Sequence, residues 1–212
     1  MCIRDRTKDP CGYAIHEGIL DLIDQAAETL RDAGYHVVEV STPSVEEPFK
    51  DWFRTLITEM DVALWPLIVE HGSDEIKTTF DYFFQMGEVL ELDSFIRDFG
   101  ERTRMMREWN LFLDEYPLVL TPIYMNRLYD WDYDLQSFEA CKDFLEASTY
   151  SMAFNYLGLP AGVIGTGLVE DRPAAVQIVG QRYREDLICD ALEALQQRCG
   201  RLTDQLWARE EL

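Results

Sequence analysis

Positive charge is scarce in this sequence. Its 212 residues include 19 Lys and Arg against 40 Asp and Glu, so the formal net charge is −21. A phosphate backbone or an anionic membrane surface would be repelled by such a chain, so neither nucleic acid nor a membrane is expected as a partner. Long apolar runs are missing as well, since no stretch reaches the roughly eighteen apolar residues that a membrane-spanning helix needs. What remains is an acidic chain with an ordinary hydrophobic fraction of 47% and enough length for one substantial core.

Complete catalytic motifs are also absent. The sequence has no Gly-x-Ser-x-Gly, no Ser-x-x-Lys, no P-loop and no Gly-x-Gly-x-x-Gly at a strand–helix junction. The three histidines, His16, His36 and His71, have no ligand partner at helical or hairpin spacing, so no metal site is predicted. Of the four lysines, Lys142 is followed by Asp143, and nothing near it would desolvate it into a base. The residues alone therefore predict neither a catalytic group nor a cofactor.

The cysteines do not have the pattern of a disulfide framework. There are five, an odd number, and no pair has Cys-x-x-Cys spacing, so reduced thiols in a cytoplasmic protein are expected. Cys189 and Cys199 fall on the apolar side of a helical pattern, which predicts core packing for both rather than catalysis. Residues Met1–Arg6 are too short and too polar for a signal peptide, and they carry no strand pattern.

The stretch Asn155–Gly180 organises the prediction of the fold. Gly158 and Pro160 should end a helix, because glycine tolerates a left-handed cap and proline cannot continue the hydrogen-bond ladder. Pro160–Gly167 has too many breakers for a helix but suits a strand beside closely packed backbone. Polar turn residues follow, and the short apolar run Ala174–Val179 then indicates a strand buried on both faces. The pattern is that of the interior of a sheet.

Helical spacing and compact apolar runs predict the other elements. Helices are expected over Glu17–Ala33, most of Pro48–Tyr116, Ser137–Leu157 and Arg184–Cys199, and strands over Tyr35–Val40 and Leu118–Ile123. The predicted fold class is α/β: a layered mixed β-sheet flanked by helices, with a helical middle segment. The arginines of Leu92–Asp114 alternate with acidic residues, which is typical of a solvated, ion-paired helix face.

Two features of the middle of the chain are candidates for substrate contact. Phe83 and Phe84 belong to a dense aromatic patch that is either core or lid packing or an apolar substrate wall. Tyr129 and Trp131 lie in the loop Tyr129–Asp134, whose three aspartates match only the start of a calcium loop. The loop lacks the glycine and the bidentate glutamate that such a site needs, so we expect a surface loop at the rim of a pocket instead.

Asn155–Gly180 resembles the C-terminal part of the amidase signature family. The pattern there is Asn-x-x-Gly-x-Pro-Ala, a strand, and then a second strand with Gln and Gly before an acidic helix. The matching residues are Asn155, Gly158, Pro160, Ala161, Pro173, Gln177, Gly180 and Glu185. Leu120-Thr121-Pro122 and the helix–strand unit that includes Asp32–Tyr35 and Val37–Val40 extend the resemblance over Lys8–Gln197. Gly165, Arg172 and Ala175 depart from the pattern and bear on the substrate-side loop rather than on the family.

The resemblance implies an amide hydrolase with a serine nucleophile, a bridging serine and a lysine base. No serine or lysine of this chain matches those positions, so no catalytic residue carries over. We therefore expect residues 8–212 to be the C-terminal part of an amidase domain, an incomplete fold that is inactive alone, preceded by a non-family and artefactual prefix over residues 1–7. Its substrate would be a small amide in the full-length enzyme. Assembly into a homo-oligomer is compatible with the sequence. One alternative is a non-catalytic module that binds a separate chain carrying the serines and the lysine. The other is an unrelated α/β domain.

Overall fold

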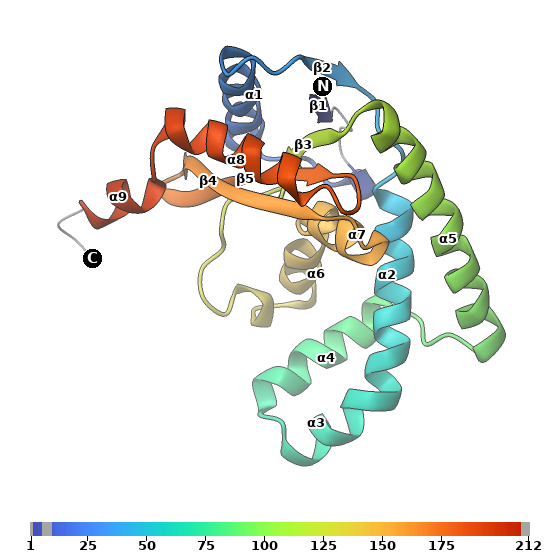
Figure 1. The fold of residues 1–212 in the computed structure, drawn as a ribbon. Helices are drawn as coiled ribbons and strands as arrows, with labels where there is room; N and C mark the ends of the chain where they lie inside the picture. The colour runs from blue at the N-terminus through green and yellow to red at the C-terminus, as the bar shows by residue number, and fades with distance from the viewer. Residues whose placement is uncertain (1, 6–9, 209–212) are drawn as a thin grey trace.

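The computed structural model describes residues 2–5 and 10–208 and centres on one mixed sheet of five strands (Figure 1). The strands are β1 (Cys2–Asp5), β2 (Val37–Val40), β3 (Leu118–Pro122), β4 (Ala161–Val169) and β5 (Arg172–Gly180), in the spatial order β2-β1-β3-β5-β4. The pairs β1–β2 and β1–β3 are parallel, whereas β3–β5 and β4–β5 are antiparallel. The predicted mixed sheet is confirmed.

The first strand corrects the sequence prediction. Cys2–Asp5 carries no strand pattern, yet it forms β1 between β2 and β3, with Cys2 opposite Val37 on one side and Leu118 on the other. Backbone pairing on both sides holds the segment extended, and this pairing does not depend on side-chain alternation. The rest of the predicted prefix, at positions 1, 6 and 7, lies outside the described residues.

Alternation along β3 and β5 divides the interior into two cores. Val119 is paired with Val179, and both side chains belong to the core on one face of the sheet. Leu120 is paired with Ile178, and both belong to the core on the other face. All four are fully buried, as expected for central strands covered on both faces.

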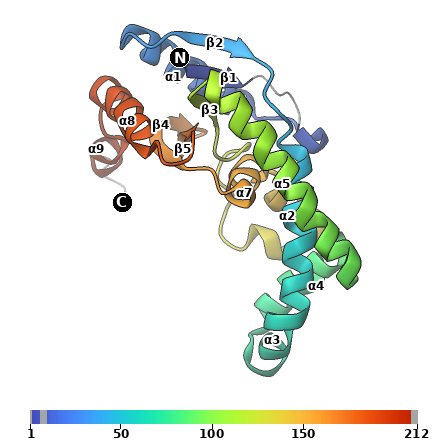
Figure 2. The same ribbon diagram turned by 45° about the vertical axis from the view of Figure 1, so that its right-hand side comes forward.

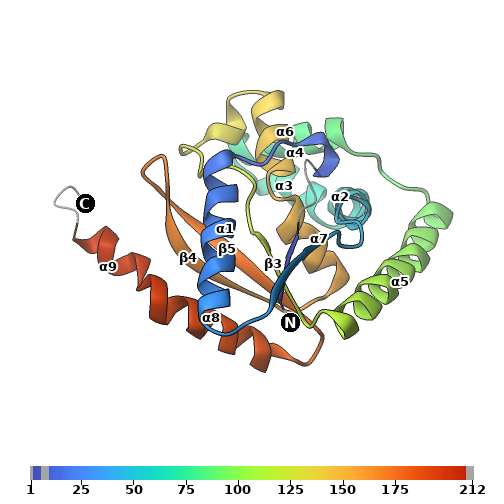
Figure 3. The same cartoon turned by 90° about the horizontal axis from the view of Figure 1, so that it is seen from above.

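Helices cover both faces. The helices are α1 (Glu17–Asp32), α2 (Glu46–Glu59), α3 (Trp65–His71), α4 (Asp74–Met86), α5 (Leu92–Glu115), α6 (Phe138–Glu146), α7 (Thr149–Leu157), α8 (Glu185–Cys199) and α9 (Leu202–Trp207), with short helical turns at Pro10–Gly12, Met60–Leu64 and Tyr133–Leu135. Side chains of α1 and α8 form one core with the sheet, and those of α2, α5 and α7 form the other. Figure 3 shows α2, α5 and α7 gathered on one side of β3. The helix α1 begins where the His16 ring accepts from the Gly18 N–H and ends before Gly34 at a φ of +95°.

The predicted helical middle forms an arm. The helices α3 and α4 project away from the sheet in both side views (Figures 1 and 2). Aromatic rings pack within the arm: Phe83 meets Phe53 edge-on at 6.0 Å between ring centroids, and Phe84 meets Trp65 edge-on at 5.3 Å. Within residues 2–5 and 10–208, none of the helices combines the length and the apolar character needed to cross a bilayer.

The helix predicted over Ser137–Leu157 is two helices. Its N-cap is confirmed, because the Ser137 hydroxyl accepts from the Ala140 N–H at 3.1 Å. The break follows α6, where the Ala147 carbonyl accepts from the backbone N–H of Met125 at 2.8 Å. This contact turns the Ala147 carbonyl toward the segment after β3, and α7 begins at Thr149. A long-range backbone contact of this kind leaves no trace in the local sequence.

The hairpin β4–β5 packs tightly under α8. A Cβ atom at Gly162 would stand 2.4 Å from Leu192 Cδ1 and 2.7 Å from Ile188 Cγ2, so a larger residue would have to displace these side chains. The predicted strand beside closely packed backbone is thereby confirmed. The core position predicted for Cys189 is wrong, because Cys189 is exposed. The buried face of α8 consists of Ile188, Ala191 and Leu195, and Cys189 lies off that face. The strand β4 is the last of the sheet.

Candidate active site

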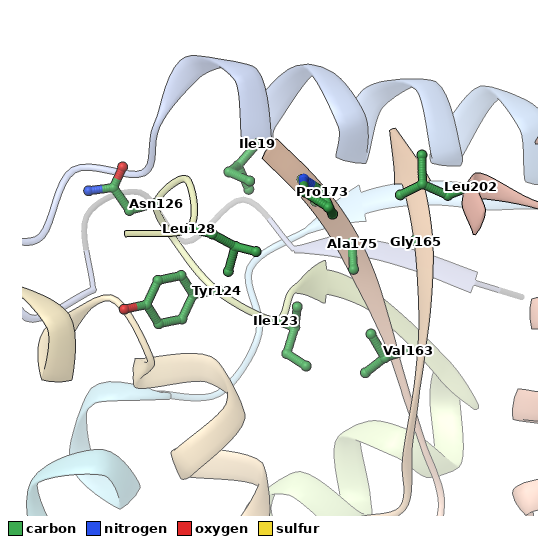
Figure 4. Close-up of a pocket in the computed structure, with 11 residues that line it drawn as sticks. Ile19, Ile123, Tyr124, Asn126, Leu128, Val163, Gly165, Pro173, Ala175 and Leu202 are labelled. Atoms are coloured by element: carbon green, nitrogen blue, oxygen red, sulfur yellow. The ribbon is translucent and has the colours of Figure 1, made fainter. Parts of the chain in front are cut away.

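An apolar cavity of about 270 Å³ lies where β3 ends, beside the β4–β5 hairpin (Figure 4). Its position follows from the sequence, because Pro122 ends β3 and the chain then leaves the sheet as a loop. Figure 4 shows Tyr124 and Asn126 together on the side of the cavity away from Leu202. The lining residues are Ile19, Ile123, Tyr124, Asn126, Leu128, Val163, Gly165, Pro173, Ala174, Ala175 and Leu202. A mainly apolar cavity with a few polar groups on one side is typical of a small-molecule site.

Behind the polar side stands a network of phenols on one carboxylate. The hydroxyls of Tyr129 and Tyr133 both donate to Oδ2 of Asp143, the second at 3.0 Å. The two rings stack with centroids 4.1 Å apart and planes 2° apart. Because a carboxylate accepts both hydrogen bonds, the pair of rings is held in one orientation.

Asn126 connects this network to the cavity. Its amide nitrogen donates to the Tyr13 hydroxyl at 2.8 Å and to the Tyr129 hydroxyl at 3.0 Å. Its amide oxygen accepts from the backbone N–H of Arg127 at 2.8 Å. Both ends of the amide are therefore engaged, which fixes its orientation at the cavity wall.

The phenols of the network and of neighbouring Tyr124 stay protonated above neutral pH. Burial is the main cause that raises the pKa of Tyr124 and of Tyr129 well above its ordinary value. Burial also raises the pKa of Tyr13, and the hydroxyl of Tyr129 offsets part of that rise. Neutral phenols can donate hydrogen bonds but carry no charge, so this side of the cavity offers polarity without a positive group.

Ion pairs hold the loop after β3 against the β4–β5 turn. Arg172 pairs with Asp130 and also donates to the Tyr129 carbonyl at 3.3 Å. On the neighbouring side, Glu170 accepts from Arg127 at 2.8 Å and lies 3.5 Å from the Nε2 atom of His16. Arg172, a departure from the family pattern, therefore helps to fix the rim loop.

The four residues predicted to contact substrate are placed apart. Tyr129 belongs to the phenol network beside the cavity, whereas Trp131 is 91% exposed at the tip of the loop. Phe83 and Phe84 pack in the helical arm and do not line this cavity. Substrate contact by these four residues stays a prediction.

Sequence reasoning missed Tyr13, Asn126 and Asp143. The hydrogen bond from Asn126 to Tyr13 spans 113 positions, and no local pattern reports a contact of that range. In the sequence, Asp143 stands out only as the acidic neighbour of Lys142. The only local signal was the pair of tyrosines, Tyr129 and Tyr133, within one short loop.

Other parts of the described chain offer less chemistry. A larger cavity of about 560 Å³ between the end of α2 and the start of α5 is lined by Thr58, Glu59, Val62, Ala63, Leu90, Leu92 and Phe95. Its lining brings together one carboxylate and no opposite charge. Lys50 pairs with Glu46, and Lys142 lies 3.8 Å from Glu146, so both ammonium groups face a carboxylate. No group of three or more His, Cys, Asp or Glu residues that could hold a metal occurs between residues 10 and 208 or in 2–5.

Comparison with known proteins gives the family of the chain. Residues 7–189 match the protein-family model described as Amidase. The chain is 31% identical over 188 residues to an indoleacetamide hydrolase of Bradyrhizobium japonicum, covering 88% of this chain and 40% of that protein. It is 27% identical over 207 residues to a glutamyl-tRNA(Gln) amidotransferase subunit of Fusobacterium nucleatum, covering 87% of this chain and 42% of that protein.

Solved structures share the fold. A bacterial aryl acylamidase of the amidase signature enzymes superposes with a TM-score of 0.71 at 18% identity, covering 96% of this chain and 44% of that one. The chain thus spans about two fifths of the length of the curated relatives it matches. Since the family match covers most of its residues, the chain belongs to the amidase signature family.

Proposed function

We propose that this chain is the C-terminal, substrate-side portion of an amide hydrolase. Residues 8–212 are assigned to the amidase domain, and residues 1–7 to a prefix whose strand β1 takes a place in the sheet between β2 and β3. The single observation that carries the proposal is the apolar cavity where β3 ends, beside the hairpin whose sequence has the family pattern. The serine nucleophile, the bridging serine and the lysine base are proposed to lie on another stretch of polypeptide, so the chain is inactive alone.

The proposed substrate is a small carboxylic amide with an apolar, planar acyl part. The cavity supports this class, because its walls are aliphatic apart from Tyr124 and Asn126 on one side. A relative is named an indoleacetamide hydrolase, and the acyl part of indoleacetamide carries a planar ring. In the proposed reaction the acyl group would rest against Ile123 and Val163, while water and the missing serine complete its transfer to the free acid.

The alternative is a non-catalytic module that binds a separate chain carrying the catalytic groups. Its support is the similarity to one subunit of an amidotransferase, together with β4, whose outer edge pairs with no described strand. A cytoplasmic, reducing setting is proposed for either function, supported by the free thiols of Cys11, Cys141, Cys189 and Cys199.

Activity assays separate these functions. The purified chain, and a fusion of residues 8–212 to the unmatched N-terminal three fifths of the indoleacetamide hydrolase, would be assayed on indoleacetamide. We expect ammonia release from the fusion and none from the chain alone. Turnover by the chain alone would refute the proposal. Activity on simple mixing of the two unfused pieces would favour the module that binds a separate chain.

A further inference from the structure

Two arginines meet at the C-terminal end of α7. Arg102 of α5 donates from Nε to the Tyr156 carbonyl at 2.6 Å, and Arg182, just after β5, donates from Nη2 to the Leu157 carbonyl at 2.7 Å. Backbone N–H groups of the following residues satisfy the two carbonyls before these. The last turn of the helix is therefore fully capped, and both guanidinium groups keep further N–H donors.

These two arginines lack an acidic partner. In residues 2–5 and 10–208, no carboxylate lies within 4.0 Å of either guanidinium group, although the chain carries a net charge of −21. Glu101, next to Arg102, pairs instead with Arg104 at 2.8 Å. The C-terminal end of the helix supplies only about half a unit of negative charge against them. The two positive charges therefore exceed the negative charge of the helix end. Arg102 departs from the ion-paired face predicted for α5, whereas Arg97 and Arg104 pair with acidic neighbours as predicted.

Gly158 opens the space between the two groups. It adopts a φ of +64°, and the point where a Cβ atom would stand is 3.0 Å from Nη2 of Arg182 and 3.7 Å from Nη2 of Arg102. Both guanidinium groups thus converge above this glycine. The buried Nε of Arg182 has no hydrogen-bond partner among the described residues. An oxygen acceptor that approaches over Gly158 meets donors from both arginines.

An aromatic cavity adjoins this pair. It measures about 230 Å³, and its wall combines Trp52, Leu56, Phe99 and Tyr156 with Arg102 and the polar side chains of Thr55, Glu59 and Asn155. The Arg102 guanidinium lies 5.3 Å from the centroid of the Tyr156 ring, a cation–π contact that keeps it flat against the wall. Arg102 therefore belongs to both the cavity and the arginine pair. The walls suit a planar ring, and the pair suits an oxyanion at one end of that ring.

We propose that the C-terminal end of α7 binds a small aromatic carboxylate, with the carboxylate between Arg102 and Arg182 and the ring in the adjoining cavity. This site is separate from the candidate active site. Gly180 is paired with Leu118 at this end of the sheet, whereas Val176 is paired with Pro122 at the end that holds the apolar cavity. The proposal does not rest on the proposed function.

Titration of the full chain with benzoate tests this site. Binding is followed by calorimetry and by the arginine Nε–H NMR signals, with acetate and inorganic phosphate as probes that lack the ring. We expect saturable benzoate binding at least about tenfold tighter than acetate or phosphate binding, because only benzoate uses both cavity and pair. The Nε–H signals of two arginines should shift together.

Two substitutions separate binding from capping. Arg182→Lys keeps a positive donor for the Leu157 carbonyl but loses the planar fork, and it should weaken benzoate binding at least about tenfold. Arg184→Lys is the matched control, because Arg184 pairs with Asp186 on the surface, and its binding should equal that of the wild type. Should Arg182→Lys fail to fold, Phe99→Leu on the 47% exposed Phe99 tests the cavity and should weaken benzoate but not acetate binding.

Three results would overturn the proposal. They are an absence of saturable benzoate binding, equal binding by Arg182→Lys or Phe99→Leu and the wild type, and phosphate or acetate binding as tight as benzoate binding. Any of them leaves the arginine pair as a helix cap alone.

Discussion

Tyr129 and Tyr133 stack in parallel and place both hydroxyls on one oxygen of Asp143. This contact joins the rim loop to α6, and Asn126 carries it on to the wall of the apolar cavity. The shape of the candidate site therefore depends on a polar network that itself does not line the cavity, apart from Asn126. The predictions below begin from that dependence.

Asp143→Asn should lower the free energy of unfolding by about 1–3 kcal/mol, because the half-buried hydroxyls of Tyr129 and Tyr133 lose a charged hydrogen-bond acceptor. Urea unfolding at neutral pH measures the loss. Asp190→Asn on the exposed side of α8 is the matched control and should change stability by less than about 0.5 kcal/mol. Equal stability of the two variants would show that the network contributes nothing to the fold.

Alkaline pH should destabilise the protein through the same phenols. Unfolded tyrosine loses its proton near pH 10, whereas burial raises the folded-state pKa of Tyr124 and Tyr129. The folded state thus binds more protons above that pH, and its stability, complete below about pH 10, falls as pH rises further. Tyr129→Phe should flatten this fall.

Urea unfolding between pH 9 and pH 11 checks the slope. The control is Tyr183→Phe, since Tyr183 is 88% exposed, and it should follow the wild type. Buried Cys141, with its pKa raised to about 11 by burial, is common to all three proteins and cancels in the comparison. Parallel slopes for Tyr129→Phe and the wild type would contradict the prediction.

Gly162→Ala should destabilise the hairpin under α8. The new methyl group would stand 2.4 Å from Leu192 Cδ1 and 2.7 Å from Ile188 Cγ2, so these side chains must move, at a cost of about 1–3 kcal/mol. Gly100→Ala inside α5 meets open space and should raise stability by about 0.5–1 kcal/mol, because alanine favours the helix. Thermal unfolding of the two variants should therefore shift in opposite directions, and a shared direction would refute the packing argument.

Phe83→Ala should lower stability by about 1–3 kcal/mol through lost contact with Phe53 in the helical arm. In the fusion enzyme we expect the KM for aromatic amides to stay unchanged, because Phe83 packs away from the apolar cavity. A raised KM with unchanged stability would restore the alternative, in which Phe83 and Phe84 form a substrate wall.

Much of the fold is predictable because its signals are local. The helix α1 has apolar spacing, and the sequence Gly158-x-Pro160 correctly marks the end of α7 and the approach to β4. The break between α6 and α7 is not predictable, since it depends on the Met125 N–H reaching the Ala147 carbonyl. The strand β1 is another case, because backbone pairing alone holds it.

The candidate site is less predictable than the fold. The loop pattern identifies Tyr129, but its partners Tyr13 and Asp143 come from distant segments. The charge pattern of α5 places Arg102 among several ion-paired arginines, and only the structure shows it on the Tyr156 carbonyl. Polar contacts between distant segments follow from tertiary arrangement, which periodicity does not encode.

The central claim is that the cavity where β3 ends receives the acyl part of an amide. Its most direct test is Ala175→Phe in the fusion enzyme, since Ala175 lines the cavity and the added ring would fill it. Ala161→Phe is the control, placed on the same hairpin at an exposed position outside the cavity. We predict that Ala175→Phe lowers kcat/KM for indoleacetamide about 10–200-fold while acetamide turnover and the control stay unchanged. Equal kcat/KM ratios for the two amides in Ala175→Phe and in the unsubstituted fusion would contradict the account.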